Sequence, residues 1–150
     1  MDPKRKLVPP VFFLSTVIAM FVLHEFFPIL RFGSVPLRIA GAAVMILGFC
    51  ITIASAKRFS KLGTPVRPFE ESTMVVTTGL FRYTRNPMYL GMAVALLGIA
   101  FMLSSASAFI PIPACVAIIH YRFVLHEERF MENLFGEEYL AYKNTVRRWI

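Results

Sequence analysis

The chain has 150 residues, a formal net charge of +7 and 57% hydrophobic residues, with a mean hydropathy of +0.63. This composition is too apolar for an ordinary soluble domain and indicates an integral membrane protein. The length fits a single domain over residues 1–150. The basic residues flank apolar runs and form no soluble patch, so we expect membrane lipids as partners and no nucleic acid.

Four apolar runs predict membrane-spanning helices, at Val8–Leu30, Pro36–Ala56, Met88–Leu103 and Ala108–Leu125. The first two are long enough to cross a hydrocarbon core of about 30 Å. The last two are shorter and predict a helical hairpin around Ser104–Ser107. The predicted fold is therefore all-α, a bundle of four transmembrane helices.

The basic residues predict an orientation in the membrane. Most of them lie before the first run, between the second and third runs, or after the fourth run, and only Arg31 and Arg38 lie on the opposite side. By the positive-inside rule, both termini and the polar segments Lys57–Pro87 and His126–Ile150 are expected in the cytoplasm. A bacterial or archaeal plasma membrane is expected, with the endoplasmic reticulum as the alternative. So thin a bundle could also form a homodimer.

Two pairs of glycines predict close helix packing. Gly41 and Gly48 lie in the second run, and Gly91 and Gly98 lie in the third. A separation of seven residues is about two helical turns, so each pair lies on one face of its helix. Small residues on a membrane helix allow another helix to approach closely.

The first candidate site is the sequence RYTRNPMY, which directly precedes the third run. Pro87 disfavours helical geometry at Asn86, so the helix is expected to start there. The backbone N–H groups of a first helical turn, with Arg85 beside them, suit an anionic group such as a carboxylate. A positively charged helix flank with an Asn cap is the alternative.

The second candidate is the pair Glu127 and Glu128, which follows the fourth run. Two carboxylates can bind a ligand ammonium group or ribose hydroxyls. They can also form ion pairs with Arg82, Arg85 or Arg122, and composition alone slightly favours the ion pairs. Which of the two roles applies stays open from the residues alone.

The third candidate is the β-branched sequence TMVVTT at residues 73–78, which is extended in character. It could offer backbone groups to a flat ring such as adenine, or it could be a surface loop. The fourth candidate is His24 with Glu25, because ionisable residues inside a membrane span are expensive. We expect a structural pair with Arg31 or Arg38 there.

The two cysteines, Cys50 and Cys115, lie in apolar runs without a paired motif. Cysteines in such positions are more typical of buried small hydrophobic residues than of a disulfide or a metal site. No metal site is therefore expected.

The sequence GLFRYTRNPMYLG followed by HEERFMENLFGEEYLAYK resembles the isoprenylcysteine carboxyl methyltransferase family, which is related to phospholipid N-methyltransferases. The family pattern is Gly-x-(Tyr/Phe), Arg-His-Pro-x-Tyr-x-Gly, a Glu-Glu pair, and Phe-Gly-x-x-Tyr-x-x-Tyr. The resemblance covers Thr73–Arg148. It implies an integral membrane methyltransferase that uses S-adenosyl-L-methionine and methylates a lipophilic small molecule, lipid or prenylcysteine-like acceptor.

The resemblance also implies site residues. Arg85 and Glu128 take catalytic positions, with Arg85 and the helix N-terminus facing the methionine carboxylate. Arg122 and Phe123 take substrate positions. The implied cofactor-binding residues are Met74, Val75, Val76, Phe81, Asn86, Pro87, Met88, Tyr89 and Glu127.

Two residues depart from the family pattern. Asn86 stands where the family has a histidine, so it can hydrogen-bond but cannot titrate. Phe123 stands where the family has a substrate-facing arginine, with Arg122 next to it. The second departure argues against a carboxylate acceptor of the prenylcysteine type.

Two rival functions remain. Membrane sterol reductases share a similar Arg-His-Pro-x-Tyr region and bind NADPH, although they are usually much longer. A non-catalytic membrane protein could also keep the motif as a structural cluster of ion pairs. Cofactor binding distinguishes these alternatives from a methyltransferase.

Overall fold

The long elements of secondary structure in the described part of the chain are all helices. The structure is a computed structural model that describes residues 8–63 and 73–150, and these ranges contain no β-strand. The basic residues before the first span and residues 64–72 of the predicted polar segment lie outside them. The long elements are α1 (Pro9–Phe26), α2 (Val35–Lys61), α3 (Pro87–Leu103), α4 (Pro111–Ile119), the π-helical turn η4 (His120–Val124) and α5 (Leu125–Phe135).

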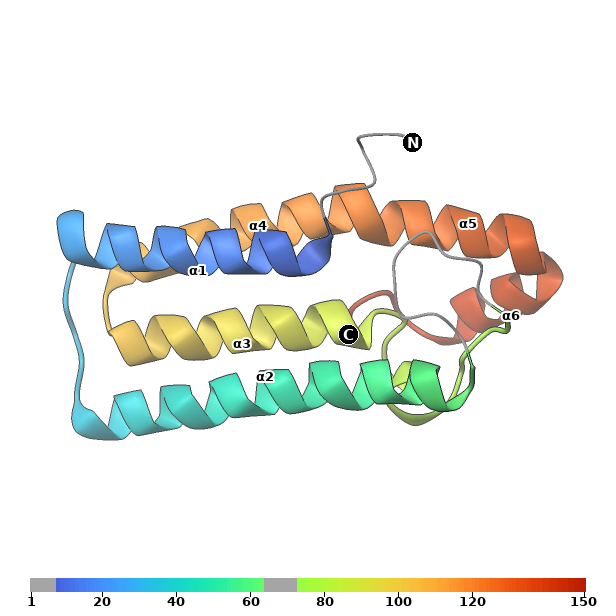
Figure 1. Cartoon of the computed structure of the whole chain (residues 1–150), viewed down its shortest axis with the longest axis horizontal. Helices are drawn as coiled ribbons and strands as arrows, with labels where there is room; N and C mark the ends of the chain where they lie inside the picture. The colour runs from blue at the N-terminus through green and yellow to red at the C-terminus, as the bar shows by residue number, and fades with distance from the viewer. Residues whose placement is uncertain (1–7, 64–72) are drawn as a thin grey trace.

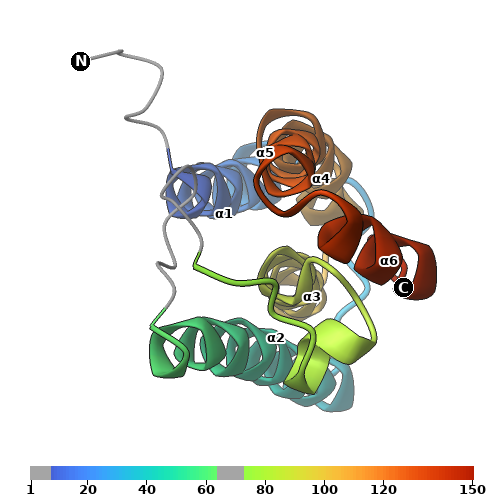
Figure 2. The same ribbon diagram turned by 90° about the vertical axis from the view of Figure 1, so that its right-hand side faces the viewer.

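The helices form a bundle in which α1, α2, α3 and α4 run in alternating directions (Figure 1). Helices α4, η4 and α5 form one long rod that extends beyond the other helices. Seen along its length, α3 lies in the middle with α1, α2 and α4 around it (Figure 2). The short elements are the 3₁₀ turns η2 (Gly79–Arg82) and η3 (Ala106–Phe109), and α6 (Glu137–Thr145).

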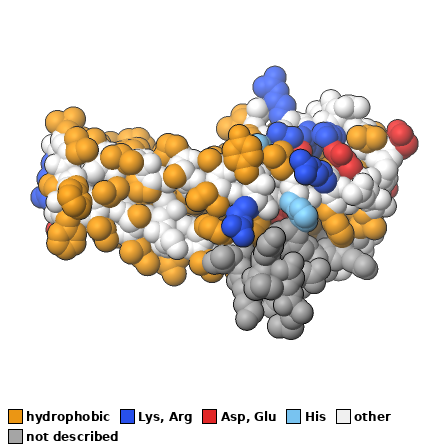
Figure 3. Space-filling model, turned by 90° about the horizontal axis from the view of Figure 1, so that it is seen from above, with side chains coloured by type: hydrophobic (Ala, Val, Ile, Leu, Met, Phe, Trp, Pro, Cys, Tyr) orange, Lys and Arg blue, Asp and Glu red, His pale blue; other side chains and the backbone are white. Residues whose placement is uncertain are grey.

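The bundle has an apolar part and a polar end. Helices α1 and α2 and the rod from Ala106 to Phe135 are long and apolar enough to cross a membrane, and α3 is a shorter apolar helix. Hydrophobic side chains cover the part in which the helices lie side by side, whereas most charged side chains on the face in Figure 3 gather at the end that carries α5. The predicted all-α membrane bundle is therefore confirmed.

The predicted spans differ from the helices at their ends. The first span was expected to reach Leu30, but α1 ends at Phe26, because Pro28 follows and disfavours helical geometry at Phe27. The second span was expected to end at Ala56, but α2 continues to Lys61. The fourth continues through the π turn into α5, which ends at Phe135 and is followed by Gly136 with φ +51°, a conformation that favours glycine.

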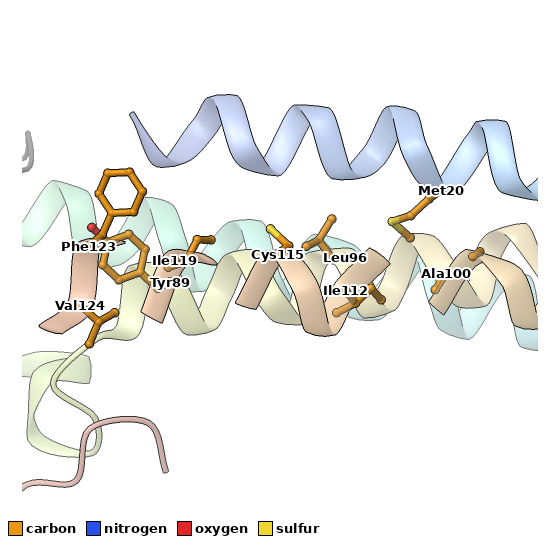
Figure 4. Packing of buried hydrophobic residues seen from close by; sticks show 10 residues of the cluster. Met20, Tyr89, Leu96, Ala100, Ile112, Cys115, Ile119, Phe123 and Val124 are labelled. Atoms are coloured by element: carbon orange, nitrogen blue, oxygen red, sulfur yellow. The ribbon is translucent and has the colours of Figure 1, made fainter. Parts of the chain in front are cut away.

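The core lies between α1, α3 and the rod. Met20 of α1 contacts a cluster to which α3 contributes Leu96 and the rod contributes Ile112 and Phe123, all nearly inaccessible to solvent (Figure 4). The Phe123 ring packs edge-on against Phe12 with their centroids 5.7 Å apart. This packing fixes the rod relative to α1.

Helices α2 and α3 are in close contact through the four glycines, as predicted. A Cβ atom added at Gly48 would meet the backbone nitrogen of Ala95, and would lie 2.5 Å from the carbonyl oxygen of Gly91. A Cβ at Gly91 would in turn lie 2.6 Å from the carbonyl oxygen of Gly48. Thr52 adds a hydrogen bond across this interface, from its hydroxyl to the Met88 carbonyl at 3.2 Å.

Replacing Gly48 by alanine is therefore expected to destabilise the bundle by about 1–3 kcal/mol, the usual effect of overpacking, because the contacted atoms are backbone and cannot move aside. Denaturation in detergent would measure the loss. Ala54→Leu is the control, since it adds a larger group on the exposed face of the same helix. Equal stability of Gly48→Ala and wild type would contradict the packing.

The end of the bundle opposite α5 contains His24 and Glu25. Glu25 lies 3.9 Å from Nε2 of His24, and Arg31 donates Nη2 to the His24 carbonyl at 3.3 Å. In the described part of the chain neither Arg31 nor Arg38 forms an ion pair with Glu25. The predicted partner of Glu25 was therefore wrong, because Arg31 is bound by a backbone carbonyl instead.

Candidate functional site

The polar end brings together four parts of the chain. These are the segment before α3, the first turn of α3, helices α5 and α6, and the C-terminal residues that follow α6. After α6 the chain turns back towards the start of α3 (Figure 1), and the backbone of Arg148 contacts Thr84 and Asn86. Most of the residues predicted for the site lie in this region.

Helix α3 starts where the sequence predicts, with Pro87 in its first turn and Asn86 as the N-cap residue. The Asn86 side chain does not cap the helix. Its Nδ2 donates to the backbone carbonyl of Arg148 at 3.1 Å, and the Thr84 hydroxyl donates to the same carbonyl at 3.1 Å. The residue that replaces the family histidine thus connects the start of α3 to the C-terminal segment.

A buried ion-pair cluster joins Arg85, Glu128 and Arg148. Arg85 donates Nη2 to Oε1 of Glu128 at 3.0 Å, and Arg148 donates Nη2 to Oε2 of Glu128 at 2.7 Å. The side chains of Arg85 and Glu128 are only 7% and 5% exposed. The hydrogen bond to Glu128 also raises the pKa of Arg148, which keeps this guanidinium charged.

The Arg85 guanidinium group also donates to two backbone carbonyls. Its Nη1 donates to the carbonyls of Lys143 and Val146 at 2.8 and 2.6 Å, and its Nε donates to Glu128 at 3.3 Å. An arginine with these contacts orders the α6 end and the C-terminal segment around itself. Of the three arginines considered as ion-pair partners, Arg85 pairs with Glu128, and the second partner of Glu128 is Arg148 rather than Arg82 or Arg122.

Glu127 points to a different partner. Its Oε1 accepts a hydrogen bond of 2.7 Å from the hydroxyl of Tyr89, which is buried in the first part of α3. Adjacent residues on a helix are about 100° apart around the axis, so the two glutamates of the pair serve different faces of α5. Glu127 faces α3, while Glu128 binds the two arginines.

Apolar residues from the segment before α3 complete this region. Val75, Val76 and Phe81 are buried, whereas Met74 is 41% exposed. Val75 packs against α6, and the Phe81 carbonyl accepts a 2.7 Å hydrogen bond from Tyr142. Burial raises the pKa of Tyr142 to about 12, so its hydroxyl stays protonated as the donor.

The two predicted substrate residues lie apart from the cluster. Phe123 is 2% exposed and belongs to the core. Arg122 is exposed, and its guanidinium carbon lies 6.0 Å from the centre of the Phe12 ring on α1. Both lie in the π turn η4, a distortion that is frequent at functional sites.

Sequence reasoning missed the C-terminal residues of the site. Arg148 was counted only among the basic residues that predict the membrane orientation, and Trp149 was not among the predicted site residues. Trp149 is half-buried, packs against the core and donates Nε1 to Nδ1 of His120 at 3.4 Å. No spacing in the chain signals these contacts, because Arg148 lies 20 residues beyond Glu128 and 62 beyond Asn86.

A shallow depression lies on α4 and η4 beside Trp149. Its lining is mostly apolar, with His120 and Tyr121 at the end nearer the polar region. The lining residues are Ile112, Pro113, Val116, Ala117, His120, Tyr121 and Trp149.

An apolar helical bundle with acidic, basic and aromatic side chains at one end fits an enzyme that works at a membrane surface. The phospholipid methyltransferase family model matches residues 37–138, and the chain belongs to this family. The protein is therefore a membrane methyltransferase, and the resemblance seen in the sequence is confirmed at the level of the family. The chain is also 33% identical over 63 residues to an uncharacterized protein of Haemophilus influenzae, a match that covers 42% of this chain and all of that protein.

Proposed function

We propose that the protein transfers a methyl group from S-adenosylmethionine to a lipophilic acceptor dissolved in the membrane. The observation that carries this proposal is the hydrogen bond between Tyr89 and Glu127. It places a carboxylate from α5 beside the first turns of α3, at the polar end of a bundle that belongs to a methyltransferase family.

The residues at this end fit the chemical groups of the cofactor. Glu127 supplies an acceptor for an ammonium group or a ribose hydroxyl. The first turn of α3, which starts at Pro87, supplies backbone N–H groups and a positive dipole end for a carboxylate. Val76 and Phe81 supply apolar surface for a flat ring.

The structure supports a changed role for Arg85 and Glu128. Both were expected at catalytic positions, with Arg85 facing the methionine carboxylate, but each is buried and bound by the other and by the C-terminal segment. We therefore propose that they position the Thr84–Asn86 segment and α5, and that the helix N-terminus binds the cofactor carboxylate instead of Arg85.

When bound, the cofactor supplies a methyl group on a sulfonium, which is already activated for displacement. The protein then has mainly to align an acceptor with that methyl group, and such positioning can supply most of the rate. An amine acceptor must also lose a proton. Glu128 is a poor base for this step because two guanidinium groups bind its carboxylate.

The acceptor is proposed to be a lipid or another lipophilic molecule that enters from the bilayer. A prenylcysteine-like carboxylate is the less favoured acceptor, because the family's arginine is replaced by Phe123, which is buried in the core. We propose that the polar end faces the cytoplasm of a prokaryotic plasma membrane, as the basic residues predict. A homodimer remains part of this proposal.

Calorimetric titration of the detergent-purified protein with S-adenosylhomocysteine and, separately, with NADPH tests the proposal. We expect binding of S-adenosylhomocysteine only, followed by transfer of labelled methyl groups into a membrane lipid extract. Binding of NADPH alone would favour a reductase. Binding of neither compound by folded protein would mean that the polar cluster is structural.

A further inference from the structure

The C-terminal segment Val146–Trp149 connects every part of the polar end. Its backbone carbonyls accept from three consecutive residues before α3: Arg148 accepts from Thr84 and Asn86, and Arg147 accepts from the Arg85 N–H at 2.9 Å. The carbonyl of Val146 accepts from the Arg85 side chain at 2.6 Å. The segment therefore fixes the backbone that leads into α3.

The same segment is anchored on α5 by a side chain. Arg148 binds both carboxylate oxygens of Glu128, with Nε 2.9 Å from Oε1 and Nη2 2.7 Å from Oε2. A two-point contact of this kind fixes orientation as well as distance. Glu128 is next to Glu127, the residue proposed to bind the cofactor. Arg148 therefore joins the start of α3 to the helix that carries Glu127.

We infer that Arg148 is a positioning residue, which sets the first turn of α3 and Glu127 at the separation that the cofactor requires. This inference rests on the proposed function. It does not make Arg148 a ligand contact, because the guanidinium acts through Glu128 and the backbone carbonyl of Arg148 acts through Asn86 and Thr84.

Arg148→Ala separates positioning from folding. The Arg148 side chain is 34% exposed, and its removal leaves Glu128 paired with Arg85, so no buried charge loses its last partner. Arg147→Ala is the matched control, because it removes the same charge from an exposed neighbouring side chain and keeps the backbone carbonyl. Arg148→Lys keeps the charge but loses the two-point contact.

Calorimetry with S-adenosylhomocysteine, well below the melting temperature of each variant, measures affinity and binding stoichiometry separately. We expect Arg148→Ala to raise the Kd about tenfold at unchanged stoichiometry, Arg148→Lys to recover part of the affinity, and Arg147→Ala to match wild type. Hydrogen exchange should show faster exchange at the Arg85 amide in Arg148→Ala alone.

An unchanged Kd in Arg148→Ala would overturn the inference, and so would a loss of stoichiometry at constant Kd, because the residue would then act only on folding. Equal losses of affinity in Arg148→Ala and Arg147→Ala would also overturn the inference, since the effect would then come from the change in net charge. These outcomes differ from wild-type protein that binds no S-adenosylhomocysteine, which would overturn the proposed function and this inference together.

Discussion

Replacing Glu127 by glutamine is expected to raise the Kd for S-adenosylhomocysteine by about 10- to 150-fold, because a hydrogen bond to a charged group contributes about 1.5–3 kcal/mol. Glutamine keeps the size of the side chain and can still accept from Tyr89, which donates to Glu127 at 2.7 Å. It removes the negative charge that we propose for the cofactor ammonium group. Calorimetry on wild type and variant measures the change.

Tyr89→Phe is the companion variant for this prediction. It removes the hydroxyl that orients Glu127 but leaves the carboxylate, so we expect a smaller loss, of about five- to tenfold. Glu132→Gln controls for charge on the same helix, because Glu132 is partly exposed and pairs with Lys143 instead. Wild-type affinity in Glu127→Gln would contradict a direct contact between Glu127 and the cofactor. Another group of the protein would then bind the cofactor ammonium group.

The architecture was largely predictable because membrane spans have a strong local signal. Four apolar runs predicted the long helices, and two pairs of glycines predicted the close approach of α2 and α3. The errors lie at helix ends. The first span was predicted to reach Leu30 and the second to end at Ala56, whereas α1 ends at Phe26 and α2 continues to Lys61.

The candidate site was predictable only in part, because motif residues were visible and their partners were not. Glu127, Glu128 and Tyr89 stood out in the sequence, but nothing in it said that the two glutamates face different helices. The two glutamates face different partners because adjacent residues on a helix lie about 100° apart around its axis. The partner of Glu128 also depends on the return of the chain after α6, which brings Arg148 to α5. The contribution of Arg148 depends wholly on this return, since its contacts are distant in sequence.

Removing Glu128 is expected to have the largest effect on stability. Glu128→Ala would leave the buried Arg85 guanidinium without its counter-ion, and breaking such a pair on one side costs about 3–5 kcal/mol. Arg85→Met should lower the free energy of unfolding less, because the Glu128 carboxylate would keep Arg148 as its counter-ion. Thermal unfolding in detergent would rank the two variants.

A partly exposed ion pair between α5 and α6 provides the comparison that decides the cause. Glu132 and Lys143 also form an ion pair, but their side chains are 29% and 33% exposed, so Glu132→Ala should cost less than about 1 kcal/mol. If the losses in Glu128→Ala and Glu132→Ala were equal, burial of Arg85 would not be the cause. A large loss only in Glu128→Ala would mean that this ion-pair cluster stabilises the polar end on which the proposed cofactor site is built.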